Sequence, residues 1–180
     1  MAIIYITGVE GSGKSTICKE LMARGYAALD IDETGLSARY VKKTGERIKT
    51  LPPKDQLTAE WYDERERMLP ASDIKRLGNQ ANRTLLFLCG VTENFDEIKD
   101  LFTKIICLTL DETTTIYRVT NRLHHGYGKT AVELSRILSN RAIYEQKNKD
   151  YGSTMIDASQ SVSRVAEIII SNVSRELQRI

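Results

Sequence analysis

The chain has 180 residues, 41% hydrophobic and 28% charged, proportions that are ordinary for one globular domain with a buried core. The formal net charge of +2 is too small to favour nucleic acid or an anionic membrane surface as a partner, and we expect neither. Three cysteines at unrelated spacings, no signal peptide and no long apolar run together predict a reduced, cytoplasmic protein.

The amino-terminal segment predicts a strand, a glycine-rich loop and a helix in succession. Ala2–Thr7 is a short apolar run with β-branched residues, which is typical of a buried strand. Lys14–Arg24 places apolar residues on one helical face and is followed by Gly25. Between them, Gly8–Thr16 matches the phosphate-binding loop pattern G-x-x-x-x-G-K-[ST] completely. Because the flanking elements fit as well, a chance glycine-rich turn is the poorer interpretation.

The residue types of this loop are those that bind a nucleoside triphosphate with Mg²⁺. Glycines let main-chain amides approach a polyphosphate, and the positive end of the following helix faces the anion. We expect Lys14 to reach the β- and γ-phosphates and the Ser15 hydroxyl to bind Mg²⁺. The residues assigned to ATP are Gly8, Glu10, Gly11, Ser12, Gly13, Lys14, Ser15 and Thr16.

Two aspartates follow the second predicted strand, Tyr26–Leu29. If that strand lies beside the phosphate-loop strand, Asp30 and Asp32 flank the γ-phosphate. We predict that Asp30 organises Mg²⁺ through water and that Asp32 accepts the proton of an attacking hydroxyl, although the two roles could be exchanged. The alternative is a helix cap followed by a solvated acidic loop.

Residues 34–70 interrupt the alternation of strands and helices and are too long for a simple connection. The segment begins basic, and Thr58–Met68 has helical character and carries Trp61 and Tyr62. We predict an acceptor-binding insert over residues 34–70. Trp61 either stacks on a substrate ring or packs the accessory helix.

The remaining chain alternates strands and helices and predicts an α/β fold, with a parallel five-stranded sheet and helices on both faces, in one domain over residues 1–180. Further strands are predicted at Leu85–Cys89, Lys104–Leu110 and Thr154–Ile156. Helices are predicted at Phe95–Phe102, Glu112–Leu123, Thr130 to about Tyr151, and Val162–Leu177. Asn94 and Asp111 precede two of these helices, and Thr130 with Glu133 forms a capping box.

Two arginines precede a glycine-containing loop at residues 123–130, which we expect to be a short lid over ATP. Phosphoryl transfer needs cations over the migrating group, and arginine suits this role. Arg122 is the better catalytic candidate because it is nearest the loop, whereas Arg118 fits a nucleotide contact or an exposed helix position. Gly90, after the third long strand, is expected to bend the chain beside the acceptor pocket.

These features together resemble the small P-loop kinases, namely shikimate kinase, gluconate kinase and the nucleoside monophosphate kinases. Asp30-Ile31-Asp32 resembles the Asp-x-Asp after strand two of shikimate kinases. The helix with Tyr117-Arg118 and Arg122 resembles the one that enters the ATP lid. Two further segments resemble the helix after the lid and the loop that borders the adenine: Arg141–Glu145 and Asp157-Ala158-Ser159.

The resemblance implies a three-layer P-loop kinase fold, ATP and Mg²⁺ as cofactors, nucleotide contacts from Asp157, Ala158 and Ser159, and an acceptor contact from Arg141. The chain departs from the family pattern at Cys89-Gly90-Val91, where shikimate kinases have three glycines. The Arg-Pro-Leu-Leu lid signature and the Gly-Phe-Pro-Arg of monophosphate kinases are also missing from the sequence. The fold and the type of reaction therefore carry over, and the acceptor does not.

The sequence thus predicts an ATP-dependent kinase that transfers the γ-phosphoryl group to a small hydroxyl-bearing acceptor. The expected catalytic residues are Lys14, Asp32, Arg122 and Arg141. The expected acceptor contacts are Asp32, Gly90, Arg141 and Trp61. A nucleoside or nucleoside monophosphate kinase is one alternative. A nucleotide-dependent switch or assembly ATPase is the other.

Overall fold

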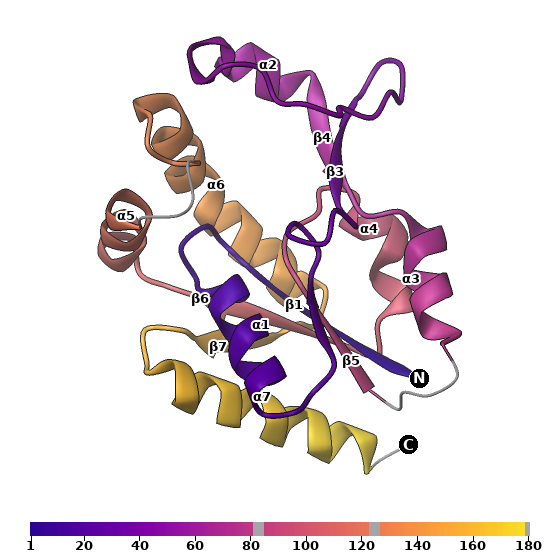
Figure 1. Cartoon of the computed structure of the whole chain (residues 1–180). Helices are drawn as coiled ribbons and strands as arrows, with labels where there is room; N and C mark the ends of the chain where they lie inside the picture. The colour runs from indigo at the N-terminus through magenta and orange to yellow at the C-terminus, as the bar shows by residue number, and fades with distance from the viewer. Residues whose placement is uncertain (81–84, 123–126, 179–180) are drawn as a thin grey trace.

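The computed structural model describes residues 1–80, 85–122 and 127–178, and its centre is a parallel five-stranded sheet (Figure 1). The strand order is β2-β5-β1-β6-β7. The strands are β1 (Ala2–Gly8), β2 (Ala28–Asp30), β5 (Leu85–Cys89), β6 (Lys104–Thr109) and β7 (Thr154–Asp157). The predicted parallel sheet is confirmed. However, β5 lies between β1 and β2, so the second strand is not beside the phosphate-loop strand, which was the condition for both aspartates to flank the γ-phosphate.

Helices cover both faces of the sheet, as predicted. Because side chains alternate along a strand, Ile4 and Ile6 of β1 face one layer, whereas Ile3 and Tyr5 face the other. The first layer consists of α1 (Lys14–Ala23) and α7 (Val162–Leu177). The second contains α3 (Ala71–Gly78), α4 (Phe95–Ile98) and the 3₁₀ turn η2 (Lys99–Leu101). Two further helices lie between β6 and β7 in the chain, α5 (Glu112–Asn121) and α6 (Ala131–Asp150).

The three predicted helix starts are confirmed, two of them with a side-chain cap. The Asp111 carboxylate accepts a hydrogen bond from the Thr114 amide at 2.8 Å. Thr130 and Glu133 form the predicted capping box at the start of α6. Asn94 differs, because its side chain does not cap α4 but accepts a hydrogen bond from the Leu69 amide at 3.0 Å. Asn94 therefore fastens the chain after β5 to the end of the 34–70 segment.

The 34–70 segment contains an antiparallel ribbon of β3 (Ala38–Val41) and β4 (Arg65–Met68), which projects from the sheet with α2 (Ala59–Asp63) near its tip (Figure 1). A 3₁₀ turn, η1 (Lys54–Gln56), precedes α2. The helix predicted over Thr58–Met68 is wrong beyond Asp63. Arg65–Met68 is extended because it pairs with β3, with Ala38 opposite Met68.

Residues 123–126 of the predicted lid lie outside the described residues. Its last part, from Tyr127 onward, leads into the capping box of α6. No helix among the described residues is long and apolar enough to span a membrane.

Candidate active site

The phosphate loop connects β1 to α1, and its backbone permits only glycine at key positions. A Cβ atom on Gly8 would lie 2.4 Å from the Leu108 carbonyl oxygen of the neighbouring strand and 2.7 Å from Ser12 Oγ. Gly13, immediately before α1, has a φ of +91°, in the left-handed region that favours glycine. The loop therefore wraps tightly and ends at the start of a helix, where anions are favoured.

Two polar groups inside this loop fit a polyphosphate. Lys14 Nζ donates to the carbonyl oxygens of Gly8 and Val9 at 2.8 and 2.9 Å, so its ammonium group lies across the loop. Ser12 Oγ is buried and has no hydrogen-bond partner among the described residues. A buried hydroxyl without a partner is unfavourable, and a phosphate oxygen would satisfy it. Ser15, partly buried, and Thr16, exposed, follow in the first turn of α1.

The residues predicted to border the nucleotide come together beside Gly11. A Cβ atom on Gly11 would lie 3.6 Å from Arg118 Cβ, and the Arg118 guanidinium donates to the Ala158 carbonyl oxygen at 3.0 Å. The Asp157 carboxylate accepts from the amide and the hydroxyl of Ser159, both at 2.9 Å. This places α5 and the loop after β7 against the phosphate loop, while the contacts with adenine stay a prediction.

Arg122 connects the phosphate loop with the far end of the predicted lid. Its guanidinium lies 3.2 Å from Glu10 Oε2 in an ion pair. It also donates to the Tyr127 carbonyl oxygen at 2.5 Å. The cation predicted to act on the migrating phosphoryl group is therefore held next to the loop that would grip the nucleotide.

Asp30 ends β2 and Asp32 lies in the turn after it, and the two carboxylates have different surroundings. Asp30 is buried, and its Oδ1 accepts from the amides of Asp32 and Glu33 at 2.9 and 3.1 Å. Asp30 thus stabilises a turn, not the helix start of the alternative interpretation, and its metal role stays a prediction. Asp32 accepts a hydrogen bond from the Ser37 hydroxyl and forms an ion pair with Arg67 of β4.

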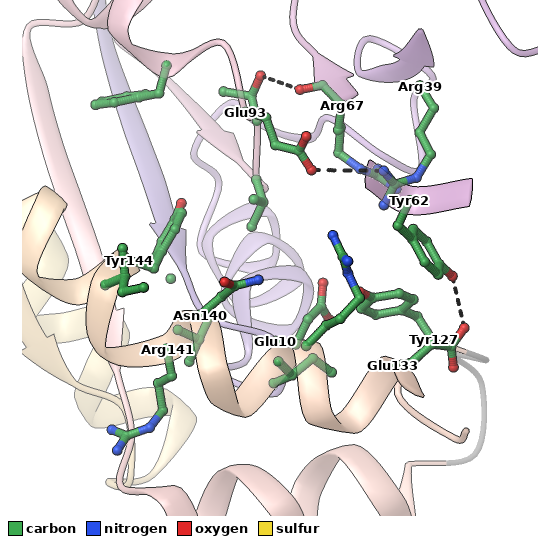
Figure 2. Close-up of a pocket in the computed structure, with 18 of the residues that line it drawn as sticks. Glu10, Arg39, Tyr62, Arg67, Glu93, Tyr127, Glu133, Asn140, Arg141 and Tyr144 are labelled. Atoms are coloured by element: carbon green, nitrogen blue, oxygen red, sulfur yellow. Dashed lines mark hydrogen bonds and ion pairs between the residues drawn. The ribbon is translucent and has the colours of Figure 1, made fainter. Parts of the chain in front are cut away.

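A cavity of 780 Å³ lies between the phosphate loop, the insert and α6 (Figure 2). Asp32 and the phosphate-loop residues Gly8, Val9 and Glu10 line this cavity together. The residues that line the cavity include Gly8, Val9, Glu10, Asp32, Arg39, Tyr62, Arg67, Tyr127, Glu133, Arg136 and Tyr144. Near β1, the hydroxyl groups of Tyr144 and Thr7 hydrogen-bond to each other.

One buried carboxylate ties the insert to α6 and to the end of the lid. Tyr62 donates to Glu133 Oε1 at 3.0 Å (Figure 2). Glu133 Oε2 accepts from the Gly128 amide at 2.9 Å. The pKa of Tyr62 is raised, mainly by burial and secondly by the hydrogen bond to Glu133, so its phenol remains a donor at neutral pH. The ring of Tyr62 also meets that of Tyr127, with centroids 5.6 Å apart.

Trp61 is not among the residues that line the cavity. Its ring packs edge-on against Tyr62, with centroids 5.1 Å apart, and lies between two guanidinium groups. The guanidinium carbon of Arg39 is 5.8 Å from the ring centroid, and that of Arg65 is 4.7 Å from it. Trp61 therefore packs the insert, which was the second of the two predicted roles.

Gly90 has surroundings other than those expected, whereas Arg141 lines the cavity but also has partners within the protein. A Cβ atom on Gly90 would lie 2.2 Å from Ile31 Cγ1, so glycine is required here by core packing. The Arg141 guanidinium donates to the Leu110 carbonyl oxygen at 3.1 Å and lies 3.7 Å from a carboxylate oxygen of Glu112. Figure 2 shows it pointing away from Arg39 and Arg67. Acceptor contacts from both residues stay predictions.

The residues that reasoning from sequence missed are Arg67, Glu133, Arg136 and Tyr127. Arg67 lies in the segment expected to be helical, and Glu133 was recognised only as a helix cap. The spacing of Thr130 and Glu133 gave no sign of Tyr62, which is 71 residues away from Glu133 in the chain. Among the described residues, no group of three or more His, Cys, Asp or Glu side chains could hold a metal ion. A magnesium ion at Ser15 would therefore depend mainly on phosphate oxygens and water.

A protein-family model described as an AAA domain matches residues 4–139, and the chain belongs to this family. No curated protein sequence matches the chain.

Several solved structures of small kinases share the fold. A gluconokinase from Sinorhizobium meliloti 1021 has 18% identity and a TM-score of 0.55, over 97% of this chain and 92% of that one. A deoxyadenosine kinase from M. mycoides has 18% identity and a TM-score of 0.55, over 96% and 99%. A shikimate kinase from Aquifex aeolicus vf5 has 16% identity and a TM-score of 0.54, over 98% and 98%. These matches confirm the resemblance to small P-loop kinases and the α/β P-loop kinase fold.

Proposed function

We propose that the protein is an ATP-dependent phosphotransferase that moves the γ-phosphoryl group to a hydroxyl of a small acceptor. The observation that carries this proposal is the single cavity whose lining includes both the phosphate loop, at Gly8, Val9 and Glu10, and Asp32. In-line transfer requires the donor and the acceptor to meet in one space, and a phosphate loop and a candidate base that line the same cavity support it.

Each residue then has a defined task. Lys14 exchanges its carbonyl partners for phosphate oxygens, and the Ser12 hydroxyl gains the partner that it lacks in the protein. Mg²⁺, when bound with the nucleotide, would be held by Ser15 and would neutralise phosphate charge. Arg122, beside Glu10, supplies positive charge at the transferring group.

Asp32 orients the acceptor hydroxyl. Its partners, Arg67 and Ser37, fix the position of the carboxylate that would accept the proton. The insert covers this part of the cavity and limits the access of water, which protects ATP from hydrolysis.

A nucleoside or nucleoside monophosphate kinase is the second candidate. It is favoured by the aromatic side chains that line the cavity, Tyr62, Phe95, Tyr127 and Tyr144, because nucleobases stack on such rings. A switch or assembly ATPase is less well supported, since it has no need of a cavity that joins the phosphate loop to Asp32.

The experiment is an acceptor screen that measures ADP release from Mg·ATP. Sugar acids, polyols, nucleosides and nucleoside monophosphates are added one at a time to the purified protein. We expect at least one class to stimulate ADP release well above the rate without acceptor. Slow release that no acceptor stimulates would contradict the proposal and favour the switch ATPase.

A further inference from the structure

Glu10 places a negative charge within the loop that is predicted to bind a polyphosphate. It lies between Val9 and Gly11 and lines the cavity (Figure 2). The rest of the loop suits an anion, because it offers main-chain amides, the Ser12 hydroxyl and the Lys14 ammonium group. A carboxylate beside these groups repels a phosphate unless a cation compensates its charge. Glu10 therefore needs such a cation whenever the loop is occupied.

Arg122, immediately after α5, supplies the compensating charge. Its guanidinium lies 3.2 Å from Glu10 Oε2 and donates to the Tyr127 carbonyl oxygen at 2.5 Å. The side chains of Arg122 and Glu10 are only 22% and 31% exposed, so water and salt screen this ion pair less than a pair on the open surface. Glu10 and Tyr127 line the cavity, whereas Arg122 is not among the described residues that line it. The guanidinium is thus held behind its two partners.

The ion pair with Glu10 leaves donors that an oxyanion would satisfy. Arg122 Nε is buried and has no hydrogen-bond partner in the described part of the chain. The same is true of Ser12 Oγ, two residues after Glu10. Buried donors without partners are unfavourable, so both favour a ligand with several charged oxygens at the loop.

We propose that Glu10 competes with the γ-phosphate for Arg122. In the protein without nucleotide, Arg122 pairs with Glu10, and when a triphosphate occupies the loop, Arg122 exchanges this carboxylate for γ-phosphate oxygens. A diphosphate lacks the group that competes, so its binding leaves the ion pair intact. Glu10 is therefore a positioning residue that acts through Arg122.

This inference rests on the proposed phosphotransferase function and concerns the regulation of the same site. Part of the binding energy of the γ-phosphate is used to break the ion pair, so ATP positions Arg122 for transfer without binding more tightly. Until the γ-phosphate is present, the charge of Arg122 stays neutralised by Glu10. Glu10 thereby lowers the preference of the loop for a triphosphate over a diphosphate.

Isothermal titration calorimetry with Mg·ADP and the non-hydrolysable Mg·AMP-PNP tests this competition. In E10Q the side chain keeps its size and loses its charge, so the γ-phosphate no longer competes with a carboxylate. We expect the affinity for AMP-PNP to rise by about three- to tenfold, the equivalent of one modest ion pair. The affinity for ADP should change by less than about twofold, which also shows that the loop is intact.

The matched control is E20Q, which removes the same charge from a similar ion pair. Glu20 pairs with Arg24 on α1 at 2.8 Å, and the two side chains are 29% and 26% exposed. Neither residue is among those that line the cavity. Both nucleotide affinities in E20Q should therefore stay within about twofold of those of the unmodified protein.

A double-mutant cycle shows whether Glu10 acts through Arg122. R122M should weaken the binding of AMP-PNP and leave that of ADP nearly unchanged. When E10Q is added to R122M, we expect a smaller gain in AMP-PNP affinity than in the unmodified protein, because no guanidinium is released. An equal or larger gain would mean that Glu10 simply repels the γ-phosphate, and it would overturn the inference.

The other outcomes are also decisive. Unchanged or weaker binding of AMP-PNP in E10Q, or an equal rise for both nucleotides, would overturn the inference and leave the proposed function standing. Loss of ADP binding in E10Q would mean that Glu10 shapes the loop itself, which would overturn it as well. Failure of the unmodified protein to bind either nucleotide would instead contradict the proposed function.

Discussion

At the scale of single residues, Lys14 illustrates how the loop is prepared for an anion. Its ammonium group is held by the carbonyl oxygens of Gly8 and Val9, which are neutral acceptors. Phosphate oxygens are stronger acceptors because they are charged, so the exchange of partners favours nucleotide binding.

The variant K14A should therefore weaken Mg·ATP binding by at least about a hundredfold. Isothermal titration calorimetry measures this directly. K19A is the matched control, since Lys19 is on the same helix, is exposed and pairs with Glu33 at 3.1 Å. We expect K19A to bind like the unmodified protein. Equal affinity in K14A would mean that the nucleotide does not occupy this loop.

Asp32 is the residue whose replacement best separates binding from chemistry. In D32N the side chain keeps its size but cannot accept the acceptor proton as a carboxylate does. We expect turnover to fall by about 10²- to 10⁴-fold, while the affinity for Mg·ATP changes little. Measurements of kcat and of nucleotide affinity on the same preparation test this. Lost nucleotide affinity would make Asp32 chiefly a metal residue.

The sequence placed both aspartates at the end of the second strand but could not distinguish their roles. Asp30 accepts hydrogen bonds from two amides of the turn, and Asp32 faces the cavity with Arg67. The difference depends on the path of the chain after Asp30 and on Arg67, which is 35 residues away from Asp32. A local pattern contains neither piece of information.

At the scale of elements, the contact between α2 and α6 joins the insert to the end of the lid. Glu133 accepts from Tyr62 of the insert with one oxygen and from Gly128 at the end of the lid with the other. Arg122 continues the connection from Tyr127 to Glu10. The insert and the phosphate loop are thus linked through a short series of polar contacts.

Removing one hydroxyl tests this link. Y62F leaves one oxygen of a buried carboxylate without its partner, so the free energy of unfolding should fall by about 1–3 kcal/mol. Urea denaturation measures the loss. Y117F is the control, because Tyr117 is 67% exposed on α5, and it should be neutral. We also expect Y62F to hydrolyse more ATP without acceptor, because the insert is held less firmly. Unchanged stability and hydrolysis would show that the contact is incidental.

The ribbon that carries Arg39 and Arg67 was the main element that sequence reasoning missed. Ala38–Val41 and Arg65–Met68 lack the run of apolar residues that marks the central strands, because this ribbon stands away from the sheet and its residues are only partly buried. Hydrogen bonding to β3, and not the local preference of its own residues, makes Arg65–Met68 extended. The inner strands β1 and β5 were predictable because they are buried on both faces.

At the scale of the whole molecule, the strand order determines what meets at the site. β5 lies between β1 and β2, and the loops that follow these parallel strands emerge at the same edge of the sheet. The phosphate loop follows β1, Asp32 follows β2, and Thr92 and Glu93 follow β5. All of them line the cavity. Alternation along the sequence predicted the parallel sheet, but not which strand is central.

The most direct measurement follows the γ-phosphoryl group of Mg·ATP by phosphorus NMR, with each acceptor class present in turn. We expect the γ-phosphate signal to be replaced by that of a phosphorylated acceptor, in equal amount to the ADP formed, with little inorganic phosphate. Release of inorganic phosphate at one rate, whatever acceptor is present, would contradict phosphoryl transfer as the function of this site.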